Sequence, residues 1–159
     1  MKALTSDMQL DYTVFVPEEW TQNYAQGTVG AYVGYGDSSN VTVTSFALSR
    51  EQYGISIEEF WKSYEEDLFS IGQDFAYDEG SPEAILLGGQ PAMKYSYTAT
   101  VTGIPCHFVQ VVCLYHFNVT LLTYTAQEGA YARHLEEIDD ILTHFLFHGV
   151  KSAEEEKAS

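Results

Sequence analysis

The chain has 159 residues, of which 45% are hydrophobic, and carries 23 aspartates and glutamates against 7 lysines and arginines, a formal net charge of −16. This apolar fraction excludes a globally disordered chain, and the length fits one domain, which we place at residues 1–150. Proteins bind nucleic acids mainly through lysine and arginine contacts to phosphate, so the composition excludes a nucleic-acid-binding protein.

Alternating apolar residues predict the first strands. Residues 10–16 alternate in this way and predict a strand that stops at Pro17. The polar residues 21–28 predict a loop. Two further strands, over residues 29–35 and 41–48, are joined by a turn rich in glycine, aspartate, serine and asparagine, which is typical of a hairpin.

A helix is predicted over residues 57–71, because apolar residues recur there mostly at steps of three and four. Ser56, or the residue before it, is suited to cap the N-terminus of this helix. Glu58 and Glu59 fall in the first turn, where the helix dipole favours negative charge. Gly72 is expected to end the helix.

Strand-like sequence dominates the part of the chain that follows. Strands are predicted over residues 74–77, 84–87, 92–101, 106–115 and 119–126. The last three are joined by short turns, so they must be antiparallel. Residues 111–114 are apolar on both alternating faces, and such a strand is covered on both sides. The expected fold class is therefore α+β, with an antiparallel sheet between helices in an α/β/α arrangement.

A second amphipathic helix, of roughly four turns, is predicted after the last strand. Its apolar stripe runs through Tyr131, Leu135, Ile138, Leu142 and Phe145. Its exposed side carries four carboxylates, on Glu136, Glu137, Asp139 and Asp140. The polar residues 151–159 predict a disordered tail.

The sequence predicts no membrane-spanning segment, because no run of about 18 apolar residues occurs. The first seven residues lack the long apolar core of a secretory signal. We therefore expect a cytoplasmic protein if Met1 is the native start, and an extracytoplasmic, lipoprotein-like protein if a leader was removed. The oligomeric state does not follow from the sequence.

The histidines form no recognisable metal-binding motif. His144 and His148 have the four-residue spacing of zinc-binding helices, but Gly149 follows directly and no third ligand lies at a diagnostic spacing. His134 is placed to form a surface pair with Glu136 or Glu137. We predict no metal site.

Catalytic motifs are also absent from the sequence. No Gly-x-Ser-x-Gly nucleophile motif, phosphate-binding loop or dinucleotide-binding motif occurs. Cys106 and Cys113 lie on one predicted strand, and their seven-residue separation of about 23 Å excludes a disulfide between them. The clustered carboxylates lie on predicted exposed helix faces, which do not shift a pKa as acid–base catalysis requires. We predict no enzyme, no catalytic residue and no cofactor.

Four short motifs follow one another in an order that resembles a known family. They are the strand and turn over residues 12–20 with Pro17 and Trp20, the helix start Ile57-Glu58-Glu59-Phe60, the turn Gly88-Gly89-Gln90-Pro91-Ala92 leading into Lys94-Tyr95-Ser96-Tyr97, and the closing strand and helix over residues 121–145. In this order they resemble the PsbP/Mog-like family, over residues 10–147. The family includes the photosystem II extrinsic subunit PsbP, the Ran-binding Mog protein and small bacterial relatives.

The resemblance implies an antiparallel sheet between helical layers, in agreement with the pattern above. It also implies a binding or adaptor role, because known members act mainly in this way and not as enzymes. No functional residue of those members carries over, because none of their metal-binding or partner-binding motifs is recognisable in this sequence.

The predicted function is a non-enzymatic binding or adaptor domain of a bacterial PsbP-like protein, with another protein as its partner. The contacts are expected from Trp20, Tyr32, Tyr35 and Trp61 if these are exposed, or from acidic helix faces that include Glu136 and Asp140.

Two alternatives stay open. The first is a small-ligand or metal-binding protein with a pocket at a sheet end, and the second is a hydrolase, which requires a nucleophile–base pair that we do not find. The acidity indicates either solubility or attraction to a basic protein surface or to cations. An exposed apolar patch favours the protein-binding function, and a deep pocket with convergent polar groups favours the small ligand.

Overall fold

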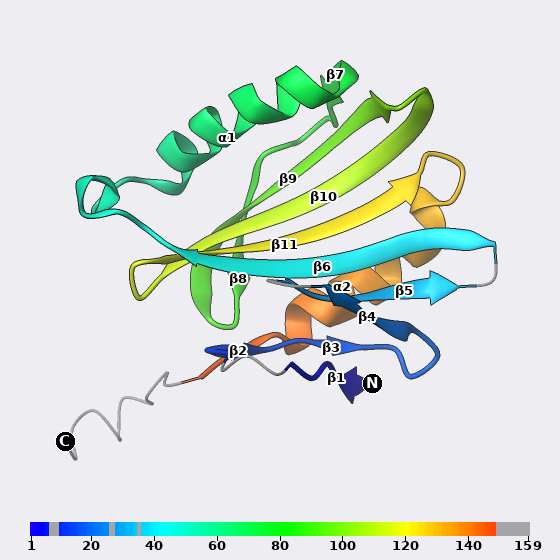
Figure 1. Cartoon of the computed structure of the whole chain (residues 1–159), viewed down its shortest axis with the longest axis horizontal. Helices are drawn as coiled ribbons and strands as arrows, with labels where there is room; N and C mark the ends of the chain where they lie inside the picture. Colours follow the sequence, from blue (N-terminus) through cyan, green and yellow to red (C-terminus); the bar gives the residue numbers. More distant parts are fainter. Residues whose placement is uncertain (7–9, 26–27, 35, 149–159) are drawn as a thin grey trace.

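The computed structural model describes residues 1–6, 10–25, 28–34 and 36–148. Its centre is an eight-stranded antiparallel sheet with the order β4-β5-β6-β11-β10-β9-β7, in which β8 also pairs with β9 (Figure 1). The strands are β4 (Thr21–Ala25), β5 (Thr28–Gly34), β6 (Asp37–Ala47), β7 (Gln73–Tyr77), β8 (Glu83–Leu87), β9 (Gln90–Val101), β10 (Ile104–Tyr115) and β11 (Asn118–Gln127).

The middle of this sheet is closed on both faces. Strand β10 pairs with β9 on one side and with β11 on the other, and its residues Val111 and Val112 point to opposite faces. Both valines are fully buried, Val111 in the core beneath α2 and Val112 in the core beneath α1. The predicted α+β fold, an antiparallel sheet between helices, is therefore confirmed.

Helix α1 (Ile57–Ile71) covers one face of the sheet. Its N-terminus is closed by a capping box, in which the Glu59 N–H donates to Ser56 Oγ at 3.1 Å and the Glu59 carboxylate accepts from the Ser56 N–H. Its apolar stripe packs against β9 and β10. The helix and its cap were predicted from the sequence with the same bounds.

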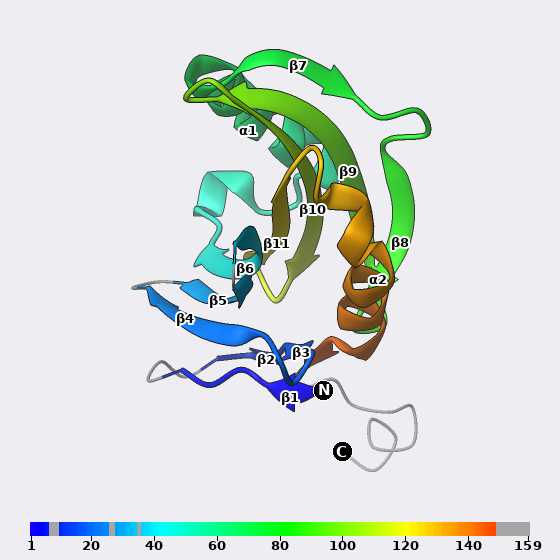
Figure 2. The ribbon, with the colours of Figure 1, turned by 90° about the vertical axis from the view of Figure 1, so that its right-hand side faces the viewer.

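The opposite face is covered by α2 (Leu135–His144) and by the N-terminal segment (Figure 2). A 3-10 turn, η2 (Tyr131–His134), precedes α2, so the helix predicted from Tyr131 begins as a tighter turn. In the described part of the chain, four short strands lie outside the main sheet: β1 (Lys2–Ala3) pairs with β3 (Phe15–Val16), and β2 (Tyr12–Thr13) pairs with β12 (Leu146–Phe147).

Two predictions near the N-terminus are wrong. Residues 10–16 do not form one strand, because β2 and β3 pair with different partners and the carbonyl of Val14 between them accepts a hydrogen bond from the Leu4 N–H at 3.0 Å. The second is the loop predicted over residues 21–28: residues 21–25 form β4, the edge of the main sheet, and Thr28 begins β5, while residues 26 and 27 lie outside the described residues. Polar side chains suit such an edge, whose outer side meets solvent.

The connection from β6 to α1 contains a second 3-10 turn, η1 (Arg50–Gln52). It lies beside the β10–β11 turn, since the Leu48 N–H donates to the carbonyl of Phe117 at 2.8 Å. Among the described helices, none is long and apolar enough to cross a bilayer. The predicted tail, residues 151–159, lies outside the described residues.

Candidate functional site

The two tryptophans predicted as partner contacts lie in the core. Trp20 is 3% exposed, and its indole N–H donates to Glu137 Oε2 at 3.1 Å. Trp61 is 4% exposed, stacks on Tyr95 with ring centroids 3.8 Å apart, and donates to the Tyr77 hydroxyl at 2.8 Å. The prediction required exposed rings, and this condition is not met, because each indole fills the space between the sheet and the elements that cover it.

The other predicted contacts do not form a single surface. Tyr32 is exposed on β5 and pairs with Asn40, so it points to the α1 side of the sheet. Glu136 and Asp140 are exposed on α2, which covers the opposite side. Tyr35 lies outside the described residues.

A groove of about 380 Å³ runs between α1 and the segment that leads into it. It is lined by Phe46, Gln52, Ile55, Glu59, Phe60, Ser63, Tyr64 and Asp67, and we call it the α1 groove. One side of α1 contributes five of these residues at helical spacing, namely Glu59, Phe60, Ser63, Tyr64 and Asp67. Phe46 comes from the end of β6, and its ring lies 5.9 Å from that of Phe60.

Three exposed aromatic residues stand beside this groove, and we call them the aromatic rim. Phe46 is 43% exposed, Tyr53 47% and Phe117 62%. Tyr53 follows Gln52 in η1, and its ring packs on that of Phe117 with centroids 4.5 Å apart. Neighbouring exposed aromatic rings of this kind are typical of an interaction site.

The turn that presents Phe117 is unusual. His116 and Phe117 join β10 to β11 with φ values of 51° and 62°. A two-residue hairpin turn with both residues at positive φ normally takes Asn-Gly, because the Cβ of most L-residues lies too close to the following carbonyl oxygen in this conformation. The chain therefore holds a large aromatic side chain at a position that favours glycine.

The α1 groove is acidic. Glu59 and Asp67 line it directly. Helix α1 as a whole carries five carboxylates and one lysine, on Glu58, Glu59, Lys62, Glu65, Glu66 and Asp67. An aromatic floor with acidic edges is suited to apolar and basic groups.

A second site lies at the other end of β11, around His134. This buried side chain has Nδ1 at 2.7 Å from Glu137 Oε1 and Nε2 at 2.8 Å from Asp37 Oδ2. Ionised carboxylates only accept hydrogen bonds, so both contacts are hydrogen bonds only when both ring nitrogens are protonated and the ring is an imidazolium. The Trp20 ring packs against it edge to face.

These contacts shift two pKa values. Burial by itself would raise the pKa of Asp37, but hydrogen bonds from Ser39 and His134 outweigh it and lower this pKa to about 2. Burial by itself would lower the pKa of His134, but the hydrogen bonds to Glu137 and Asp37 outweigh it and raise this pKa.

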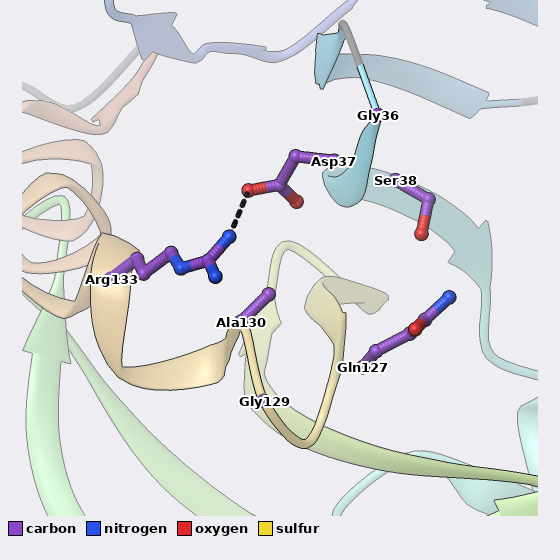
Figure 3. A pocket seen from close by; sticks show the side chains of 7 residues that line it. All are labelled: Gly36, Asp37, Ser38, Gln127, Gly129, Ala130 and Arg133. Carbon is purple, nitrogen blue, oxygen red and sulfur yellow. Dashed lines mark ion pairs between the residues drawn. The ribbon is translucent and has the colours of Figure 1, made fainter.

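A cavity of about 270 Å³ opens beside this cluster (Figure 3). It is lined by Gly36, Asp37, Ser38, Gln127, Gly129, Ala130 and Arg133. The Arg133 guanidinium reaches over it, with Nη1 at 3.9 Å from Asp37 Oδ2. A pocket of this kind, at a sheet end, is what the small-ligand alternative requires.

His107 has a similar environment. Its Nε2 lies 2.6 Å from Asp78 Oδ2 and its Nδ1 lies 3.1 Å from Glu128 Oε1, while its ring stacks on Tyr131 with centroids 3.4 Å apart. His107 thus packs on Tyr131, the first residue of η2, and His134 is the last residue of this turn.

Sequence reasoning found only one of these contacts. The predicted pair of His134 with Glu137 is present, although it is buried rather than at the surface. Its second partner, Asp37, lies 97 positions away in the chain, and no local pattern connects the two.

The cysteines are free. Burial raises the pKa of the Cys113 thiol to about 12 and also raises that of Cys106. The thiolate is the nucleophilic form, so neither side chain is activated at neutral pH. Among the described residues, no group of three or more histidines, cysteines and carboxylates is arranged to hold a metal ion.

Solved structures with a PsbP/Mog-like fold are similar to this chain. LpqN of Mycobacterium tuberculosis, described as involved in cell envelope biogenesis, is 13% identical, with a TM-score of 0.65 and coverage of 86% of this chain and 83% of LpqN. The PsbP (CyanoP) of Synechocystis is 14% identical, with a TM-score of 0.64 and coverage of 93% and 94%. Mog1 is 8% identical, with a TM-score of 0.59 and coverage of 94% and 98%.

The predicted resemblance to this fold is thereby confirmed. No protein-family model matches the chain, and no curated protein matches it. At such low identities the likeness establishes the fold and leaves the function open.

Proposed function

We propose that this protein is a non-enzymatic binding domain that docks another protein at the α1 groove and the aromatic rim. The observation that carries the proposal is Phe117, whose ring is 62% exposed on a turn held at positive φ. An exposed aromatic ring on a strained turn is unfavourable for the isolated domain. Burial of the ring against a partner contributes about 1.5–3 kcal/mol, which offsets that cost.

The resemblance to the PsbP/Mog-like family supports a binding role, because its known members act mainly as binding or adaptor proteins. The fold alone does not identify the partner. Tyr32, Glu136 and Asp140 remain predicted contacts, on surfaces away from the groove.

Affinity capture from a lysate of the source cell tests the proposal. The bait is the wild-type protein, the rim variant Phe46→Ala/Phe117→Ala, or the control variant Leu86→Ala/Ile104→Ala, which shortens two exposed apolar side chains elsewhere. We expect at least one protein to be retained by the wild type and the control and lost by the rim variant. Capture that is insensitive to the rim variant would overturn the proposal, and so would no capture at all.

The same experiment with Glu136→Gln/Asp140→Asn tests the predicted acidic contact on α2. Loss of the captured protein with this variant, and not with the rim variant, would move the binding surface to α2.

A second candidate function is favoured by the cavity beside Asp37, which gathers an arginine, a carboxylate, a hydroxyl and an amide around about 270 Å³. A thermal-shift screen tests it. A small molecule that stabilises the wild type but not Arg133→Ala, combined with the absence of any captured protein, would favour this function over protein binding.

A further inference from the structure

We infer that the α1 groove takes a basic, arginine-bearing segment of its partner, with an apolar side chain seated between two basic ones. This inference rests on the proposed function and names the chemistry of the partner. It follows from three properties of the groove: its aromatic surface, the positions of its two carboxylates and the charge of the whole chain.

The aromatic surface is fixed in place. Phe60 packs on Tyr64 with ring centroids 5.9 Å apart, and the Tyr64 hydroxyl accepts a hydrogen bond from Gln110 Nε2 at 3.2 Å. Phe46 closes the groove from the strand side, while Ile55 adds an aliphatic wall. A preformed apolar hollow of this kind takes an apolar side chain with little loss of its own freedom.

The two carboxylates lie at a defined separation. Glu59 and Asp67 are eight residues apart on α1, about 12 Å along the helix axis. Residues of an extended partner segment advance about 3.3 Å each, so two basic residues spaced by about four positions match this distance. The apolar side chain between them then lies over Phe60 and Tyr64.

Glu59 keeps room for such a contact. Its Oε1 serves the helix cap by accepting from Ser56, but a carboxylate has about four lone-pair sites on its two oxygens. The described residues that line the groove include no lysine or arginine. A basic residue entering the groove therefore meets acceptors and aromatic faces without a competing cation in the lining.

Arginine fits these features better than lysine. Its planar guanidinium stacks on aromatic faces and binds carboxylates through two parallel hydrogen bonds. The net charge of −16 also disfavours a second copy of this chain as the occupant, because two copies repel each other.

A displayed library of random 12-residue peptides, selected on the wild-type protein, tests the inference. We expect the enriched peptides to carry arginine on both sides of an apolar residue. Their affinity is expected to fall with rising salt, because the contacts include charge pairs near solvent.

Two isosteric variants then separate the groove from general charge. Glu59→Gln/Asp67→Asn removes two charges from the groove and keeps an oxygen at position 59 for the helix cap. Glu66→Gln/Glu79→Gln removes two exposed charges outside the groove lining. We expect the selected peptides to bind the first variant about 5- to 20-fold more weakly and the second as they bind the wild type.

The outcomes are distinguishable. Three results would overturn the inference of a basic segment: selected peptides that are neutral or acidic, equal losses of affinity for both variants, or a library that yields no binder. None of these results affects the proposed function as long as the captured protein still depends on the aromatic rim. If the protein captured from the lysate does not depend on Phe46 and Phe117, the proposed function is overturned as well. Equal melting temperatures for the two charge variants exclude unfolding as the cause of any difference between them.

Discussion

At the scale of single residues, His134 has the most tightly defined chemistry in the molecule. It connects α2, through Glu137, with the start of β6, through Asp37, and it packs against Trp20 from the N-terminal segment. Arg133 is the further charged group beside Asp37. A neutral imidazole has one N–H, so only the protonated ring donates to both carboxylates.

This arrangement predicts that the protein loses stability in alkaline solution. The pKa of His134 is raised in the folded protein, so the stabilisation is complete below the ordinary value of 6.5 and is lost as the pH rises through the folded value. The pKa of Asp37 is lowered from 3.8 to about 2, so its contribution is present above about pH 4 and is lost as the pH falls towards 2. We expect the free energy of unfolding, measured with urea, to fall by about 1–3 kcal/mol between pH 6 and pH 9.

The control for this prediction is the exposed His144. His134→Gln is expected to reduce the dependence of stability on pH over this range, whereas His144→Gln is expected to keep it. If wild type and His134→Gln lose the same free energy between pH 6 and pH 9, the imidazolium does not connect these elements.

At the scale of elements, α1 forms one side of the proposed binding groove, so its first turn matters for function. The helix starts at the Ser56–Glu59 capping box, and Glu59 also lines the groove. Its buried Trp61 stacks on Tyr95 of β9 and fixes the helix to the sheet. The position of the groove therefore depends on a helix held at both its cap and its middle.

Replacement of the capping residue is predicted to weaken this helix. Ser56→Ala removes the hydroxyl that accepts the Glu59 N–H, and we expect the free energy of unfolding to fall by about 1 kcal/mol. Ser56→Thr keeps a hydroxyl at the N-cap that both accepts from the Glu59 N–H and donates to its carboxylate, and is expected to retain most of the stability. Urea unfolding followed by tryptophan fluorescence measures both, and equal losses for the two variants would contradict a capping role.

Elements with strong periodicity were predictable from the sequence, and the sites were not. The helix over residues 57–71 and the strands β9 to β11 bury a regular face, so their local pattern already contains the information. The α1 groove arises only where Phe46 of β6 meets α1, and the His134 cluster requires Asp37 from another hairpin. The buried tryptophans were ambiguous, because an indole serves equally in a core and at an interface.

At the scale of the whole molecule, charge and packing oppose each other. Two apolar cores on the two faces of one sheet hold the chain together, while 23 carboxylates against 7 basic side chains repel one another over its surface. Net charge of this size keeps a protein soluble and destabilises its compact state. The same field attracts a basic partner from a distance, in agreement with the chemistry inferred for the groove.

This self-repulsion predicts that salt stabilises the protein. The screening length falls from about 30 Å at 0.01 M to below about 10 Å above 0.1 M, so repulsion between distant carboxylates weakens. We expect the urea concentration at the midpoint of unfolding to rise between 10 mM and 0.5 M sodium chloride. It should rise less in the variant Glu51→Gln/Glu66→Gln/Glu79→Gln/Glu136→Gln, in which four exposed glutamates are neutralised. The contacts of His134 are buried, so salt screens them much less, and the drop in stability between pH 6 and pH 9 should persist in 0.5 M salt. A midpoint that falls with salt, or rises equally in both proteins, would mean that local ion pairs and not net repulsion dominate the electrostatics of this fold.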